Sequence, residues 1–337
     1  MNTLTKSIRN LAAPRANGKY PDNLIDKFLP EKLARPARTA EAHIREGRFQ
    51  RSLSFLAGAS SILAGAEVAY EHYKGSYGQQ IMYTPPILGG AMTIAGLLGA
   101  FSTRAARTVL RWTSIITLLD GLVGFCYHVR GIARKPGGWR LPITNIIMGP
   151  PIFAPLLFCV SAYLGLIASF LRPEEAGPMI LRQPKAKLLS LTSDDIAAHH
   201  PWTIGLREGR FQKHLAAATV VGTFCSGAEA LYSHYKNNFR YFAQWTPVMI
   251  APLLMGAAAG AIVSPKIART WLPAMSALAI ADGAAGLYYH ARGIVRRPGG
   301  LKKPIYNVLY GPPIFAPLLF AACGTVGLLA SLMRRER

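Results

Sequence analysis

The chain has 337 residues, of which 51% are hydrophobic and only 16% are charged. Its 38 Lys and Arg outnumber its 16 Asp and Glu, which gives a formal net charge of +22 at pH 7. Soluble domains carry roughly 25% charged residues. The composition therefore argues against an ordinary soluble enzyme and against a nucleic-acid-binding protein, and it favours an integral membrane protein with basic loops.

The two halves of the chain repeat each other. Gly149–Phe158 recurs unchanged as Gly311–Phe320, and Arg45–Gln50 recurs as Arg207–Gln212. Between these anchors the copies align without a gap at an offset of 162 positions, with about two in five positions identical. Such a repeat indicates a duplicated structural unit. We predict four parts, which are a basic cytoplasmic tail (1–44), a membrane repeat (45–172), a linker (173–206) and a second membrane repeat (207–337).

Each copy contains four apolar stretches near the ~20 residues that a bilayer span needs. They cover 52–73, 85–102, 109–129 and 151–171 in the first copy, and 214–235, 247–264, 271–291 and 313–333 in the second. Four of them start with a proline, which the first turn of a helix tolerates: Pro85, Pro151, Pro247 and Pro313. The predicted fold is an all-α integral membrane protein with eight transmembrane helices. An even number of spans per copy makes the two four-helix repeats parallel.

Basic residues indicate how the spans are oriented. The face with both termini, the linker and the loops near 103–111 and 265–270 holds 26 of the 38 Lys and Arg, and the other face holds 12. Cytoplasmic loops carry the excess of Lys and Arg. We therefore expect a multi-pass protein of the cell (inner) membrane with both termini in the cytoplasm.

Four acidic residues fall inside the predicted spans, at matched positions of the two copies: Glu67, Asp120, Glu229 and Asp282. An ionisable group at membrane depth costs roughly 2.5–3.5 kcal/mol or more, so it usually faces a partner or a cavity. Each of these four acids is followed by a histidine nearer the outer face: His72, His128, His234 and His290.

Three interpretations of these groups remain open. In the first, the histidines belong to an interfacial belt and the acids make interhelical hydrogen bonds. In the second, His72 with His128, and His234 with His290, ligate haem b or another metal. In the third, carboxylates and histidines form a proton path or a ligand site.

The longer outer loops are basic and contain no acid. Each carries the phrase Arg-x-Pro-Gly-Gly, which suits a turn with a positive φ at glycine. The arginines that can bind anionic groups are Arg130, Arg134, Arg140, Arg292, Arg296 and Arg297. One interpretation is a loop that rests on lipid phosphates, and the other is a docking platform for an anionic partner or head group.

The fourth span of each copy follows a Gly-Pro-Pro segment. Pro151 can mark an ordinary helix start, with Asn145 bonding exposed backbone. It can also mark an interrupted helix that lines a cavity.

No sequence motif names a reaction, and we expect a protein that is not an enzyme on its own. Four-helix units with paired histidines resemble, at the level of the fold, membrane cytochrome b subunits, and no residue role follows from that resemblance. The leading hypothesis is a non-catalytic membrane subunit, either a redox anchor or a ligand-binding unit, with polar sites toward the outer face. Its partners would be the lipid bilayer and a membrane or extracytoplasmic redox protein, with electron transfer as a possible role. The alternatives are a proton-coupled transporter of small molecules or lipids, and a purely structural anchor.

Overall fold

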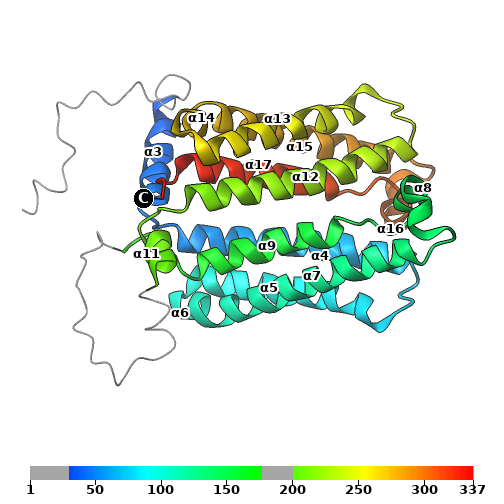
Figure 1. Cartoon of the computed structure of the whole chain (residues 1–337), viewed down its shortest axis with the longest axis horizontal. Coiled ribbons are helices and arrows are strands. Elements are labelled where there is room, and N and C mark those ends of the chain that lie inside the picture. Colours follow the sequence, from blue (N-terminus) through cyan, green and yellow to red (C-terminus); the bar gives the residue numbers. More distant parts are fainter. Residues whose placement is uncertain (1–29, 177–199, 337) are drawn as a thin grey trace, which may run out of the picture. The chain divides into compact units, whose positions relative to one another are not determined.

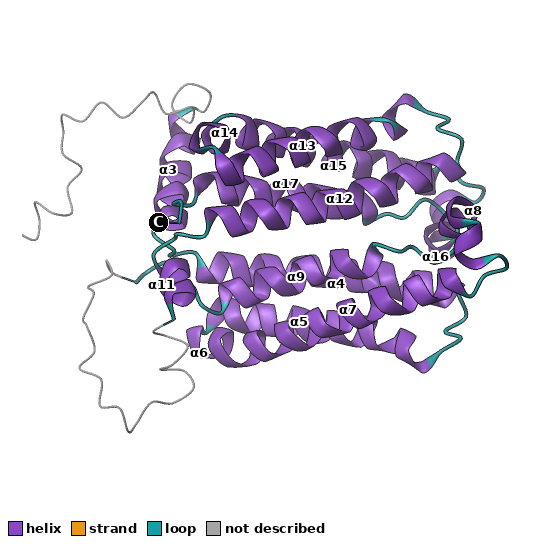
Figure 2. Cartoon of the chain, in the orientation of Figure 1, coloured by secondary structure: helices purple, strands orange, loops and turns teal. Residues whose placement is uncertain are grey.

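The computed structural model describes residues 30–176 and 200–336. Within these ranges the chain is helical and contains no strand, apart from an isolated bridge between Arg210 and Arg334 (Figure 2). Five helical segments are long and apolar enough to cross a membrane: Gln50–Lys74, Gln80–Phe101, Thr103–Ala133, Gln212–Lys236 and Phe242–Val263. The described part of the chain is thus an all-helical protein of the membrane type, in contact with lipid.

The chain divides into two units, and the first ends at Ala42. Its described part is most of helix α3 (Glu31–Arg45), which includes Pro36. The second unit runs from His43 to Arg337 and holds the remaining described helices.

The second unit begins with the helices of the first sequence copy. They are α4 (Gln50–Lys74), α5 (Thr84–Phe101), α6 (Thr103–Ala105), α7 (Arg111–Ala133), α8 (Pro142–Ile147) and α9 (Ala154–Ala168), with a π-helical turn at Ala106–Leu110. Short 3₁₀ turns cover Gln80–Tyr83 and Gly138–Arg140. Helix α4 packs against α5 and α9, and α7 packs against α9 and α5.

The helices of the second copy follow in the same order. After α11 (Pro201–Arg207) they are α12 (Gln212–Lys236), α13 (Thr246–Val263), α14 (Pro265–Arg269), α15 (Trp271–Val295), α16 (Pro304–Leu309) and α17 (Ala316–Leu332), with 3₁₀ turns at Phe242–Gln244 and Gly300–Lys302. Helix α12 packs against α13 and α17, and α15 packs against α17 and α13. Contacts of α9 with α12, of α4 with α17 and of α8 with α12 join the helices of the two copies (Figure 1).

Glycine lets neighbouring helices approach closely. A methyl group added at Gly96 of α5 would lie 2.6 Å from the Cα of Gly58 in α4, and one at Gly89 would lie 2.9 Å from the Cα of Gly65. Between membrane helices the hydrophobic effect supplies little attraction, so close backbone contact is a main source of stability. These glycines therefore fix how α4 and α5 pack.

Three of the predicted spans differ in length or hydropathy from the five long apolar helices. Helices α9 and α17 have only 15 and 17 residues. Helix α15 is 25 residues long but is not among the five segments that are apolar enough to cross a membrane.

Candidate functional site

Helices α9 and α17 begin later than the sequence predicts. The prediction placed their starts at Pro151 and Pro313, but Gly149–Phe153 and the matching segment 311–315 are irregular, and the helices begin at Ala154 and Ala316. The sequence prediction of an ordinary helix start at Pro151 was therefore wrong, because the prolines that occupy the first turns are Pro155 and Pro317. The free N–H groups at these helix starts need acceptors, since no N-cap side chain supplies one.

The half-buried Glu67 and Glu229 supply these acceptors, and each acts on the other copy of the repeat. Oε1 of Glu229 accepts the N–H of Phe153 at 2.9 Å, and Oε2 of Glu67 accepts the N–H of Phe315 at 3.2 Å. Tyr70 donates its hydroxyl to Oε1 of Glu67 at 2.8 Å, which orients the carboxyl group. A negative carboxylate also interacts favourably with the positive end of the helix dipole. The two glutamates thus form a reciprocal pair of caps, which we call the crossed caps.

Histidines also bond the same irregular segments. Nδ1 of His128 lies 2.5 Å from the carbonyl oxygen of Pro151, and Nδ1 of His290 lies 2.6 Å from that of Pro313. Each Gly-Pro-Pro segment is therefore fixed by a histidine of its own copy and by a glutamate of the other. His72 makes a similar bond at 2.6 Å to the carbonyl of Met82, just before α5.

The second pair of acids binds hydroxyl groups within its own copy. Oδ1 of Asp120 lies 2.6 Å from Oγ1 of Thr84, and Thr246 is the matching neighbour of Asp282. His72 is close enough to Asp120 to interact with it electrostatically. Oδ2 of Asp120 is buried and has no hydrogen-bond partner among the described residues. The acids therefore sit in two kinds of environment, with Glu67 and Glu229 between the copies and Asp120 and Asp282 within them.

The glycines next to Asp120 serve helix packing. A methyl group at Gly121 would lie 2.9 Å from the carbonyl oxygen of Pro155, and one at Gly124 would lie 3.3 Å from that proline's Cβ. Helix α9 therefore occupies the space beside this face of α7.

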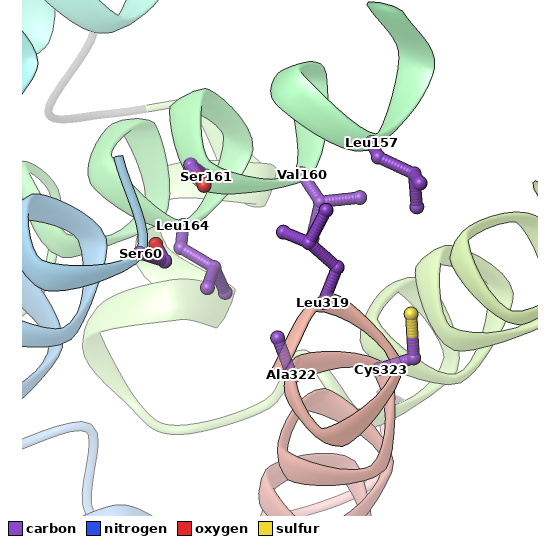
Figure 3. Close-up of a pocket in the computed structure, with 8 residues that line it drawn as sticks. All are labelled: Ser60, Leu157, Val160, Ser161, Leu164, Leu319, Ala322 and Cys323. Atoms are coloured by element: carbon purple, nitrogen blue, oxygen red, sulfur yellow. The ribbon is translucent and has the colours of Figure 1, made fainter. Parts of the chain in front are cut away.

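Of the two predicted histidine pairs, the one in the second copy is in ring contact. The rings of His234 and His290 lie 6.4 Å apart between centroids with an interplanar angle of 87°. Among the described residues no group of three or more His, Cys, Asp or Glu side chains could hold a metal ion. A cavity of about 10 Å³ where α4, α9 and α17 meet has room for about one water molecule, and its lining residues include none of these histidines (Figure 3). Haem or metal ligation by His72, His128, His234 and His290 stays a prediction.

The Arg-x-Pro-Gly-Gly turns are held from inside by buried asparagines. Nδ2 of Asn145 donates to the carbonyl oxygens of Pro136 and Gly138 at 3.1 and 2.8 Å. Asn307 makes the equivalent bonds to Pro298 and Gly300 at 3.3 and 2.9 Å. The predicted positive φ is present, at +79° for Gly137 and +83° for Gly299. Asn145 thus fixes the basic loop and does not bond the start of α9.

Two carboxylates near the starts of α4 and α12 were not predicted from the sequence. Glu174 accepts the N–H groups of Arg51 and Ser52 at the start of α4, at 3.1 and 2.8 Å. Glu336 accepts the N–H of Lys213 at 2.9 Å and interacts with Nδ1 of His214 at 3.0 Å, at the start of α12. Glu174 and Glu336 are 162 positions apart, so the repeat offset extended past residue 172 could have found the pair.

The direction of the pKa shift of Glu336 agrees with its role as a helix cap. Burial raises the pKa of Glu336, but the hydrogen bonds from His214 and from the backbone of Lys213 outweigh it and hold the pKa below the usual value for a glutamate. The charged carboxylate is therefore the form that this helix end stabilises.

Comparisons with protein-family models, with curated proteins and with solved structures found no match for this chain.

Proposed function

We propose that the chain is a non-catalytic, multi-pass subunit of the cell membrane that holds a partner or ligand on a fixed helical frame. In this proposal eight spans form two parallel four-helix repeats, 45–172 and 207–337, joined by the linker 173–206. Both termini and the basic tail 1–44 lie in the cytoplasm. The outer histidines and basic loops face the opposite side.

The helix boundaries support the proposed eight spans. Helices α4 and α12 both have 25 residues and begin 162 positions apart, and α5 and α13 both have 18. A 15-residue helix is only about 22 Å long. The irregular segment before α9 would therefore complete the fourth span. The N–H of Phe153 and the carbonyl oxygen of Pro151 are bonded to side chains of the protein, which suits a segment inside a membrane.

The hydrogen bonds of the crossed caps favour a fixed frame over a transporter. Alternating access usually rocks one repeat against the other. Such a movement would pull Glu67 from Phe315 and Glu229 from Phe153, leaving partly buried donors and acceptors unpaired. Each unpaired group costs about 1–3 kcal/mol. A fixed arrangement keeps all of these bonds.

Distance measurements between spin labels test the fixed frame. Labels at Ile94→Cys on α5 and Leu253→Cys on α13, with the exposed Cys126 replaced by Ser, would report the spacing of the two repeats. We expect one narrow distance distribution that does not change with a proton gradient. The further change Glu67→Ala with Glu229→Ala should broaden it. Two populations that shift with the gradient would favour the transporter.

The redox form of the proposal has its own test. The visible absorption spectrum and the metal content of the purified protein would show a Soret band or stoichiometric metal if the outer histidines hold a cofactor. Replacement of His72 or His128 should then remove the spectrum of one repeat only. A protein without either signal would remain a candidate anchor that binds its partner by contact alone.

A further inference from the structure

We propose that the two outer loops, residues 134–148 and 296–310, form a surface that binds the phosphate groups of anionic lipids. We call this surface the basic platform. The inference deepens the proposed function and rests on its membrane placement, because it assigns a ligand class to the outer face. Helices α8 and α16 of these loops lie at the same end of the second unit (Figure 1).

The charge of the basic platform is of one sign. The first loop contributes three basic residues and the second contributes four, and neither contains Asp or Glu. They are Arg134, Lys135, Arg140, Arg296, Arg297, Lys302 and Lys303. All except Lys135 and Arg297, which are half-buried, are exposed. With no acid in either loop to neutralise them, these cations are suited to an anion from outside.

Large apolar side chains are exposed beside the cations. Ile143 of α8 is 73% exposed and Ile305 of α16 is 75% exposed. Trp139, Tyr306 and Tyr310 are also exposed on the same two loops. Aromatic side chains with an apolar body and a polar tip gather at the membrane–water interface. Cations interleaved with such side chains fit a lipid surface, where acyl chains and phosphates are neighbours.

The loops are held in shape before any ligand arrives. Asn145 and Asn307 are at most 5% exposed, and their amides bind the Pro-Gly-Gly turns. Ordering a loop in advance lowers the entropic cost of binding. Helix α8 also contacts α12 of the second copy, which ties the first loop to the neighbouring repeat.

The lipid preference can be measured on the detergent-purified full chain by native mass spectrometry. Phosphatidylglycerol and phosphatidylcholine would be added in equal amounts, and the bound molecules of each lipid counted. We expect the wild-type protein to retain phosphatidylglycerol preferentially. The variant Arg134→Gln, Arg140→Gln, Arg296→Gln and Lys302→Gln should weaken retention by on the order of tenfold or more, since each basic residue near an anionic surface contributes up to about fivefold.

A matched control removes the same number of charges at the other end of the helices, through Arg104→Gln, Arg107→Gln, Lys266→Gln and Arg269→Gln. It should keep most of the preference for phosphatidylglycerol. Ile143→Ser with Ile305→Ser keeps every charge and should weaken retention through the apolar contact alone. If the charge variant does not fold, a salt titration of the wild-type protein and the double serine variant still test the proposal.

Three results would overturn the proposed lipid binding. The first is a wild-type protein that shows no preference for phosphatidylglycerol, and the second is an equal loss of retention in the outer-loop variant and the control variant. The third is an outer-loop variant that retains lipid as the wild type does but loses a co-purifying acidic protein. The last result would assign the platform to a protein partner. Because lipid counting in detergent does not depend on which way the chain crosses the membrane, its failure is distinct from failure of the proposed topology.

Discussion

Glu67 and Glu229 show how a single side chain can join two repeats of one chain. Each lies on the first helix of its copy and bonds a backbone N–H of the other copy, 248 and 76 residues away. The sequence predicts that an acid inside a span has a partner, and it offers interhelical bonding as one interpretation. It could not name the partner, because the donors are backbone groups and every residue except proline carries one.

The crossed caps lead to a stability prediction. Glu67→Ala removes the acceptor of both the Phe315 N–H and the Tyr70 hydroxyl, so it should destabilise the protein by about 1–3 kcal/mol for each donor left unpaired. Glu67→Gln keeps an acceptor and should cost less than 1 kcal/mol, near the ~0.6 kcal/mol average for membrane hydrogen bonds. Thermal unfolding in detergent measures both. Glu71→Ala is the control on the same helix, since Glu71 forms a partly exposed ion pair with Lys74 and accepts no N–H from the other copy in the described residues. Equal losses for Glu67→Ala and Glu71→Ala would contradict the cap.

At the scale of helices, the sequence predicts which stretches are apolar better than it predicts where they begin. Hydropathy is similar on both sides of Pro151, so it gives no sign that the helix starts at Ala154. The start is set by bonds that lie outside the local sequence, from His128 and Glu229. For α5 and α13 a proline in the first turn was sufficient, and the predicted starts at Pro85 and Pro247 lie within one residue of the observed ones.

Helix α5 offers a matched pair of glycine substitutions. Gly96→Ala places a methyl group 2.6 Å from the backbone of Gly58, whereas Gly90→Ala meets nothing within 4 Å. Gly96→Ala should push α4 and α5 apart and destabilise the protein by about 1–3 kcal/mol. Gly90→Ala should be neutral or stabilising by up to about 1 kcal/mol, since alanine favours a helix. Unfolding temperatures of the two variants give the comparison, and a stabilising Gly96→Ala would refute the close packing.

The cap at the start of α12 predicts how stability depends on pH. The pKa of Glu336 lies below its usual value in the folded protein, so its contribution is complete above the unfolded pKa of about 4.5. The contribution is lost as the pH falls through the lower folded pKa. The difference in unfolding temperature between wild type and Glu336→Gln should therefore be largest above about pH 5 and shrink on acidification. His214, the titratable partner of the carboxylate, is left in place in both proteins. A difference that stays constant down to about pH 3 would show that this carboxylate does not cap α12.

At the scale of the whole molecule, amino-acid composition and the internal repeat predict a helical membrane protein, and the described residues bear out that class. The repeat also gives matched positions, so a contact found in one copy can be sought in the other. Asp120 with Thr84 and Asp282 with Thr246 are an example. Function is harder to predict, because the polar groups inside the spans bond mostly to the backbone and to each other. A chemical role needs a substrate or cofactor, and neither the residue types nor their spacing specifies one.

The direction of the chain in the membrane is the prediction on which the proposed function depends most. Four spans in each copy place the loops around Lys135 and Arg297 on the same side, and the excess of basic residues places both termini on the other. A reporter enzyme active only outside the cytoplasm, fused after Lys135 or after Arg297, should be active in both positions. The same reporter in the linker or after Arg104 should be inactive, and a cytoplasmic fluorescent reporter should give the reverse pattern. Opposite results for Lys135 and Arg297 would mean that the copies insert in opposite directions. The crossed caps would then lose their physical basis, because Glu67 and Phe315 could face each other at one depth only if the two copies run parallel.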